Sequence, residues 1–207
     1  MMWRKIGSAS LLLALLLAAA PAPVKTKKTS GQTDPPGAPL EAVLKAKKAK
    51  YTLDLGGKSA DEVRKQIAAG NYPEAPAVEL VLEIKNTGRE EVKIKIGGTY
   101  NVVSLDLKGS GAVSEKLKRR ITPKFVIAPR TVTLEPGKSA SVPITSLSYG
   151  LRGGERAWWL EPGKYQLAAG YRTSVSPRPK DAKEEPGDFG AVTVTSAPIE
   201  LEVETPK

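Results

Sequence analysis

Residues 77–85 read Ala-Val-Glu-Leu-Val-Leu-Glu-Ile-Lys, with an apolar side chain at every second position from Val78 to Ile84. Because successive side chains of a β-strand point to opposite faces, this alternation predicts a strand with one buried and one solvated face. Residues 92–96, Val-Lys-Ile-Lys-Ile, repeat the pattern. Asn86-Thr87-Gly88 lies between the two stretches and contains residue types that accept a positive φ. We therefore expect the two strands to form a hairpin.

The period of two continues along the rest of the chain. Further strands are predicted at residues 51–55, 101–107, 131–134, 139–145, 164–171, 191–195 and 199–203. Leu-Glu-Pro-Gly-Lys occurs at 134–138 and again at 160–164, and Glu-Pro-Gly-Asp at 185–188 is a looser copy. Pro fixes φ and Gly tolerates a positive φ, so each Pro-Gly is expected to reverse the chain between adjacent strands. Many short strands with such turns indicate an all-β fold, an antiparallel immunoglobulin-like β-sandwich.

One short helix is predicted near the N-terminal end of the sandwich, over residues 60–69. Ser59-Ala-Asp-Glu62 has the capping-box pattern, and Val63 and Ile67 lie one helical turn apart. So few apolar side chains suit a helix that covers one edge or end of the sandwich and forms no core of its own. The sequence also allows a short helix over residues 40–48.

The chain is predicted to contain three segments. Residues 1–22 have the parts of a secretory signal peptide, with Arg4 and Lys5 followed by an apolar run of ten residues. Residues 23–50 form a basic, disordered spacer, and residues 51–207 form the sandwich domain. We therefore expect an exported protein of the periplasm, cell envelope or extracellular space, with the cleavage point left open. The apolar run is about half of the ~20 residues that cross a bilayer, so no transmembrane span is expected after signal removal.

Positive charge is concentrated in two places. The formal net charge is +10, and residues 23–50 carry seven Lys against two acidic residues. A second cluster contains Lys116, Lys118, Arg119, Arg120 and Lys124. Because Lys and Arg bind phosphate and sulfate groups, this cluster is a candidate patch for an anionic partner, with a solvated loop as the alternative. No aromatic side chain is interleaved within it for base stacking, so nucleic acid is not expected as a partner.

The chain contains neither Cys nor His. Their absence excludes disulfides, thiol nucleophiles, imidazole chemistry and the usual zinc, copper, haem and iron–sulfur ligand sets, so no cofactor is expected. Asp181, Glu184, Glu185 and Asp188 form an acidic loop, but their spacing matches no calcium-binding loop and no metal site is predicted. Most other carboxylates alternate along strands as a solvated face. No catalytic residue is therefore assigned, and the protein is not expected to be an enzyme.

The adjacent Trp158 and Trp159 are a further candidate site. On a strand they face opposite ways, so at least one of them is expected in the core. The other, with Tyr149 or Tyr171, is a candidate platform for a sugar ring or an anchor for a hydrophobic partner. Ordinary packing of these aromatic side chains is the alternative.

Three motifs in order resemble a known class of protein. They are Leu80-x-Leu-x-Ile-x-Asn86-x-Gly88, then Val132-x-Leu-x-Pro136-Gly137-Lys138, then Trp159-x-x-Pro162-Gly163-x-Tyr165-x-Leu167. Over about residues 77–172 the chain resembles exported bacterial immunoglobulin-like modules and is similar to the BsuPI-type proteinase-inhibitor fold. The resemblance implies a sandwich, matches no inhibitory loop residue by residue and implies no particular activity.

The sequence as a whole favours an exported, non-catalytic interaction or structural module of the cell envelope. Its partner would be an envelope protein or an anionic envelope polymer, bound by loops at the ends of the sandwich or by an exposed strand edge. The alternatives are a carbohydrate-binding module, which needs exposed planar aromatic side chains, and a proteinase-inhibitor-like module, which needs a protruding rigid loop.

Overall fold

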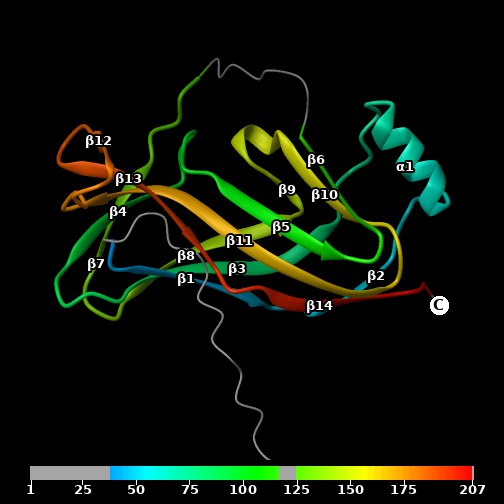
Figure 1. The fold of residues 1–207 in the computed structure, drawn as a ribbon, viewed down its shortest axis with the longest axis horizontal. Helices are drawn as coiled ribbons and strands as arrows, with labels where there is room; N and C mark the ends of the chain where they lie inside the picture. Colours follow the sequence, from blue (N-terminus) through cyan, green and yellow to red (C-terminus); the bar gives the residue numbers. More distant parts are fainter. Residues whose placement is uncertain (1–37, 117–124, 207) are drawn as a thin grey trace, which may run out of the picture.

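The computed structural model describes residues 38–116 and 125–206 and shows an all-β sandwich with one α-helix (Figure 1). The first layer has three antiparallel strands, in the order β1 (Leu40–Ala46), β3 (Ala77–Asn86) and β8 (Ser139–Ser146). The second layer is built around β11 (Gly163–Ser176), which is 14 residues long.

Both edges of β11 are paired with other strands. One edge pairs with β4 (Val92–Ile96) and β5 (Val103–Gly109), and the other with β13 (Phe189–Thr195) and β14 (Ile199–Glu204). Three short strands extend this layer: β7 (Arg130–Leu134) beside β4, β12 (Lys183–Glu185) beside β13 and β2 (Lys50–Thr52) beside β14. Among the described strands only β2 and β14 are parallel, so the antiparallel prediction is correct apart from this pair.

The edge that β4 and β5 share along β11 is interrupted. β5 pairs with residues 165–171 of β11, whereas β4 pairs only with Val175 and Ser176. Residues 97–102, between β4 and β5, form no strand and begin with Gly97 and Gly98 at φ +70° and +81°. This interruption places a loop beside the C-terminal half of β11.

A third, smaller sheet packs against the main core beside β5, and the helix lies at one end of the sandwich (Figure 1). The sheet has the order β6 (Ala112–Lys116), β10 (Glu155–Trp159) and β9 (Ser148–Tyr149), and a 3₁₀ turn (Leu151–Gly153) follows β9. The predicted helix is confirmed as α1 (Ala60–Ala68), and its Val63 and Ile67 pack with Trp158 and Leu160 into a second, small core. Within the described ranges no helix combines the length and the apolar character that crossing a membrane requires.

The capping box at the start of α1 is present in full. The Ser59 hydroxyl accepts a hydrogen bond from the backbone N–H of Glu62, and the Glu62 carboxylate accepts one from the backbone N–H of Ser59. These two bonds satisfy donors that the first turn of a helix otherwise leaves unpaired, so the local sequence fixes the start of α1.

The main core lies between the two layers and contains a buried, hydrogen-bonded tyrosine. Alternate side chains of facing strands, such as Leu82, Ile94 and Leu201, are fully buried there. Tyr165, near the start of β11, is also fully buried, and its hydroxyl donates a hydrogen bond to the backbone carbonyl of Glu161 at 2.7 Å. This bond gives the buried phenol a partner and ties the start of β11 to the turn before it.

The hairpin predicted across Asn86-Thr87-Gly88 is wrong. β3 lies in the first layer and β4 in the second, so the chain crosses between layers at this point. The Asn86 side chain is fully buried, and its Nδ2 donates to the backbone carbonyls of Glu90 at 2.7 Å and Leu134 at 2.9 Å. Its Oδ1 accepts from the N–H of Gly88 at 2.8 Å. Asn86 thus stabilises a corner between the layers and not a turn within one sheet.

Two of the three Pro-Gly turns also join different sheets. Pro136-Gly137 links β7 to β8, and Pro162-Gly163 links β10 to β11, although neither pair of strands shares a sheet. Only Pro186-Gly187 joins adjacent strands, β12 and β13. The turns are where the sequence predicts them, but the expectation that each joins paired strands is wrong for the first two.

The short helix allowed over residues 40–48 is a strand, and the spacer boundary at residue 50 is therefore wrong. β1 pairs with β3 along its whole length, and Leu40, Ala42 and Leu44 are buried against the main core. Their spacing of two belongs to a strand, and the nearby Lys45 pairs with Glu83 at 2.7 Å. The folded part thus includes residue 40. The predicted signal peptide, and the predicted spacer up to residue 37, lie outside the described residues.

Candidate functional site

The four aromatic side chains predicted to form a platform are all buried. Trp158 and Trp159 are each 3% exposed, Tyr149 is 8% exposed and Tyr171 is 1% exposed. The two Trp side chains face opposite ways, as predicted, but Trp159 lies in the main core and Trp158 lies in the second core, stacked on Tyr72. The platform hypothesis is therefore wrong, because a chain with few aromatic residues uses both Trp side chains to fill its two cores.

Most of the predicted basic patch lies outside the described residues, namely Lys118, Arg119, Arg120 and Lys124. Lys116, at the end of β6, is exposed, and its Nζ is 3.3 Å from the carboxylate of Glu155. The role of this cluster toward an anionic partner stays a prediction.

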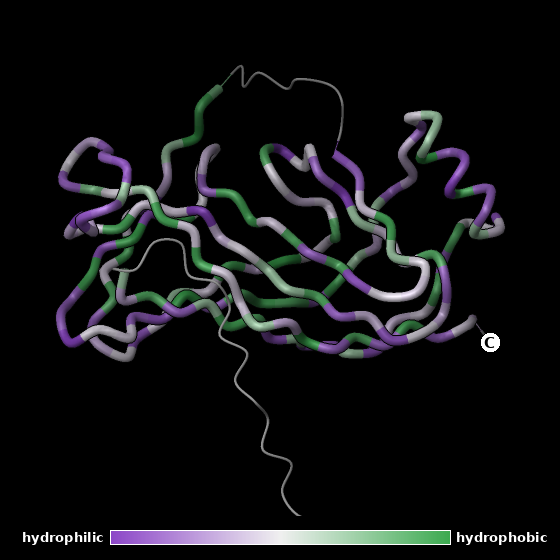
Figure 2. The backbone as a smooth tube through the Cα atoms, in the orientation of Figure 1, coloured by the Kyte–Doolittle hydropathy of each residue, from purple (hydrophilic) through white to green (hydrophobic). Residues whose placement is uncertain are grey.

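The large hydrophobic side chains that the described ranges expose come from two short segments. Tyr100 is 60% exposed, Phe125 79%, Val126 62% and Ile127 68%. Tyr100 belongs to the loop between β4 and β5, and the other three belong to the segment before β7. Figure 2 shows that segment as a green, hydrophobic stretch standing away from the layers. We call these four residues the apolar ridge.

Hydrogen bonds hold the two segments of the apolar ridge together. The N–H of Ile127 donates to Oγ1 of Thr99 at 2.7 Å, and the carbonyl of Ile127 accepts from the N–H of Thr99 at 3.0 Å. The Arg152 guanidinium donates to the carbonyl of Phe125 at 2.9 Å. The exposed side chains therefore stand on a backbone that is anchored at two points.

Two glycines and a buried tyrosine position the loop under the apolar ridge. A Cβ at Gly98 would lie 2.7 Å from the backbone nitrogen of Pro129, so a side chain there cannot fit at the present separation. Gly97 donates its N–H to the hydroxyl of Tyr171 at 3.1 Å. Burial raises the pKa of Tyr171, which keeps this phenol neutral as an acceptor over the ordinary pH range.

A cavity of about 330 Å³, here called the Asn101 cavity, lies beside the apolar ridge on the outer face of the second layer. It is lined by Lys95, Tyr100, Asn101, Val126, Ile127, Pro129, Arg172, Thr173, Ser174 and Glu185. The Ser174 hydroxyl donates to the Glu185 carboxylate, and Nζ of Lys95 is 3.8 Å from the same carboxylate. Lys95 also lies 4.3 Å from the centre of the Phe189 ring. One side of the cavity is thus polar, and the ridge supplies an apolar side.

Two donors in the Asn101 cavity lack partners. Nδ2 of Asn101 is buried and has no hydrogen-bond partner among the described residues. Arg172 is exposed and forms no ion pair within the described ranges. A buried donor without a partner costs about 1–3 kcal/mol, so an acceptor oxygen at this position would be stabilised. A second cavity of about 330 Å³ shares Asn101 and Ile127 with the first.

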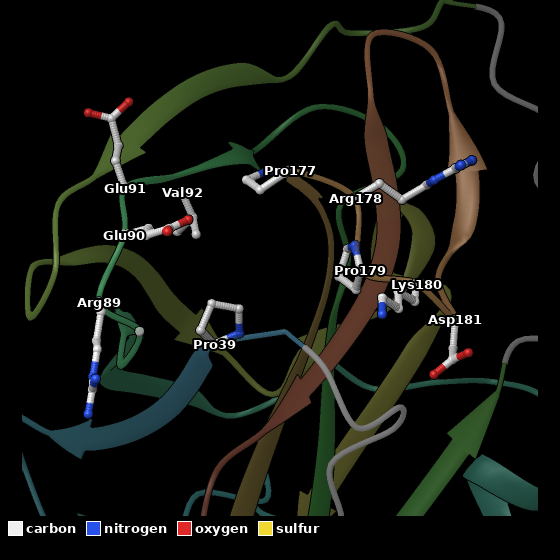
Figure 3. A pocket seen from close by; sticks show the side chains of 11 residues that line it. Pro39, Arg89, Glu90, Glu91, Val92, Pro177, Arg178, Pro179, Lys180 and Asp181 are labelled. Carbon is white, nitrogen blue, oxygen red and sulfur yellow. The ribbon is translucent and has the colours of Figure 1, made fainter.

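A larger pocket, of about 540 Å³, is lined by Pro39, residues 88–92 and residues 177–181 (Figure 3). Three prolines and Val92 give it an apolar edge. In Figure 3 the side chains of Glu91 and Arg178 extend away from the opening, and Arg178 instead pairs with Glu184 at 2.6 Å. Because few polar groups converge on this pocket, its lining offers a ligand little specificity.

Two carboxylates of the acidic loop already have partners within the protein. Glu184 pairs with Arg178, and Glu185 contacts Ser174 and Lys95. In the part of the chain that the structure covers, no three Asp or Glu side chains are placed to hold a metal ion.

Sequence reasoning does not single out the apolar ridge or the Asn101 cavity. The one local signal is Phe-Val-Ile at residues 125–127, three apolar residues in a row without the alternation of a half-buried strand. Asn101 follows β4, Arg172 belongs to β11 and Glu185 belongs to β12, and they come together only because β4 pairs with β11 and β12 reaches β11 through β13.

Comparisons with known proteins leave the family open. No protein-family model and no curated protein matches the chain. Among solved structures, a β-glucosidase from Erythrobacter marinus has a TM-score of 0.26 and 14% sequence identity over 76% of this chain. The chain spans 15% of the length of that protein. A likeness this weak carries no argument about fold or function.

Proposed function

We propose that this protein is an exported, non-catalytic interaction module of the cell envelope and that it binds a partner protein through the apolar ridge. The supporting observation is the exposure of Tyr100, Phe125, Val126 and Ile127 on two segments that hydrogen bonds between Thr99 and Ile127 hold together. Single exposed apolar side chains are common on soluble proteins, whereas an exposed cluster marks an interaction site. Export rests on the sequence of residues 1–22.

The course of the backbone supports a protein as the partner. The bonds from Thr99 and Arg152 hold residues 125–127 in place before any partner arrives. A segment ordered in advance loses little conformational entropy on binding, and large apolar side chains at the centre of an interface carry much of its affinity. The side chains of Phe125 and Ile127, the two most exposed of the ridge, would enter pockets of the partner.

The assignment as non-catalytic is supported by the surroundings of the carboxylates. Several carboxylates pair with cations at the surface, such as Glu83 with Lys45 and Glu200 with Lys164 at 2.9 Å. These pairs are solvated, and general acid–base catalysis needs a carboxyl group in a site that sets its pKa and excludes water.

A double substitution, Phe125→Ser with Ile127→Ser, tests the proposal. The protein is cross-linked in its own envelope, the captured protein is identified and purified, and its binding to each variant is titrated. We expect the dissociation constant of the double variant to be at least tenfold higher, because apolar anchors each contribute about 1–2 kcal/mol or more to binding. The melting temperature should change little, since both side chains are exposed.

The matched control is Lys164→Ser with Lys108→Ser. Both lysines are exposed on the second layer, and Lys164 lies at the opposite end of β11 from the apolar ridge. The control should bind like the unsubstituted protein. Equal binding by the ridge variant would contradict the proposal, and equal loss in both variants would point to charge or folding and not to the ridge.

A second candidate function is a proteinase-inhibitor-like module. It is favoured because the side chains of residues 125–127 are exposed while hydrogen bonds hold their backbone in place. An inhibitor presents such a segment to a protease cleft with little change of shape. The chain would then keep its intact mass during incubation with a protease that prefers large apolar residues, and would inhibit it. Rapid cleavage after Phe125 without inhibition would exclude this candidate.

A further inference from the structure

The Asn101 cavity has a polar side that suits hydroxyl groups. Lys95 of β4, Ser174 of β11 and Glu185 of β12 lie side by side on the outer face of the second layer. Their charges and hydrogen bonds partly satisfy one another, since Glu185 accepts from Ser174 and lies near Lys95. The oxygen atoms of Ser174 and Glu185 keep further lone pairs, so this side can accept hydrogen bonds from a hydroxylated ligand.

The unpaired hydrogen-bond donors of the cavity favour a negatively charged ligand. Arg172 and Nδ2 of Asn101 both donate hydrogen bonds, and neither has an acidic partner in the described ranges. Lys95 adds a second cation, against the single carboxylate of Glu185. A carboxylate or phosphate group would pair with the exposed Arg172, whose planar guanidinium favours a two-oxygen group, and an oxygen reaching the buried Nδ2 of Asn101 would give that donor the acceptor it lacks.

The apolar side of the cavity excludes the simplest anions. Tyr100, Ile127 and Pro129 line it, and the volume of about 330 Å³ lies at the small end of ligand sites, which are roughly 300–1,000 Å³. An inorganic anion would leave these side chains and most of the space without a partner. A fatty acid would place its alkyl chain against Lys95 and Glu185, which would lose water without gaining hydrogen bonds.

We propose that the Asn101 cavity binds an acidic sugar, such as one uronic acid unit of a saccharide. The carboxylate is held by Arg172 and Asn101, the ring hydroxyls bond to Glu185 and Ser174, and the apolar face of the ring lies against Tyr100 and Ile127. Ile127 belongs to both surfaces, but the sugar site depends on Arg172 and Asn101 and the protein-binding surface depends on Phe125, so either proposal can fail alone.

The test is a calorimetric titration of the full chain with three probes: a galacturonic acid trimer, the matching neutral galactose trimer and inorganic phosphate. We expect the acidic trimer to bind at least tenfold more tightly than either of the others. Asn101 provides a second readout, because its side-chain amide signal in a nitrogen–proton spectrum should shift with the acidic trimer alone.

Two substitutions of one charge each separate the cavity from general electrostatics. Arg172→Met should weaken binding of the acidic trimer at least tenfold, whereas Arg130→Met, at an exposed arginine of β7 that does not line the cavity, should change it less than threefold. Equal effects of the two substitutions would overturn the proposal. Tight binding of phosphate would contradict the assignment of the ligand as a sugar. Binding of the neutral trimer as tightly as the acidic one would contradict the role of the carboxylate.

Discussion

Substitution of Asn86 by Ala is expected to lower the free energy of unfolding by about 3–5 kcal/mol. Asn86 is fully buried, and its side chain makes three hydrogen bonds: to the carbonyls of Glu90 and Leu134 and from the N–H of Gly88. Alanine would leave the buried carbonyl of Leu134 without its partner and would also remove the two part-buried bonds to Glu90 and Gly88, each worth a further ~0.5–1.5 kcal/mol. Each buried polar group left unpaired costs about 1–3 kcal/mol.

Urea denaturation of the purified chain measures this effect, and Asn71→Ala is the matched control. Asn71 is exposed after the end of α1, so its loss should change the free energy of unfolding by less than about 0.5 kcal/mol. Asn86→Asp keeps the acceptor for Gly88 but loses both donors and adds a charge, so it should be at least as destabilising. A result for Asn86→Ala within 1 kcal/mol of the control would show that the corner does not depend on these bonds.

The same residue shows why part of the fold could not be predicted from the sequence. Alternation of apolar residues is a local property, and it correctly predicts β3, β4, β5, β7, β8, β11, β13 and β14, but not β12, which the sequence places in an acidic loop. Asn86-Thr87-Gly88 also fits a hairpin locally. The acceptor that decides otherwise is the carbonyl of Leu134, 48 residues away, and no local pattern contains it.

At the Pro-Gly turns and in β1, the local sequence also leaves open which structure forms. Pro136-Gly137 and Pro162-Gly163 reverse the chain as turn chemistry predicts, but the sheet that receives the next strand is set by its partners. In β1, Leu40, Ala42 and Leu44 have the period of a strand among Lys and Ala residues that also suit a helix. Pairing with β3 decides between the two.

The candidate site was less predictable than the fold, for the same physical reason. The sequence identifies Trp158 and Trp159 as large side chains that need a role, but their burial follows from the two cores that they join. The Asn101 cavity depends on the interruption between β4 and β5 and on the pairing of β11 with β13 and β13 with β12. Its residues are spread from Lys95 to Glu185, and no motif joins them.

Substitution of Gly98 by Ala is expected to separate the two segments of the apolar ridge while leaving the sandwich folded. Gly98 has φ +81°, and a Cβ there would lie 2.7 Å from the nitrogen of Pro129 and 2.9 Å from the carbonyl oxygen of Ile127. These are backbone atoms, so the segment before β7 must move away. Binding through the apolar ridge and binding of an acidic sugar in the Asn101 cavity should both fall at least tenfold, because Ile127 belongs to both and Pro129 lines the cavity.

Gly97→Ala is the control that separates the steric clash of a Cβ at residue 98 from the backbone strain of a positive φ. Gly97 has φ +70°, so alanine there also adopts a left-handed conformation at a cost of about 1–2 kcal/mol, but its Cβ would meet no atom within 4 Å. Hydrogen exchange should therefore accelerate at the amides of Thr99 and Ile127 in Gly98→Ala and stay nearly unchanged in Gly97→Ala, with similar melting temperatures for both. Equal exchange and equal binding in the two variants would mean that the approach of Gly98 to Pro129 does not hold the ridge. A fall in melting temperature confined to Gly98→Ala would place this contact among the interactions that stabilise the whole fold, and the ridge would then be part of the core structure and not a surface presented to a partner.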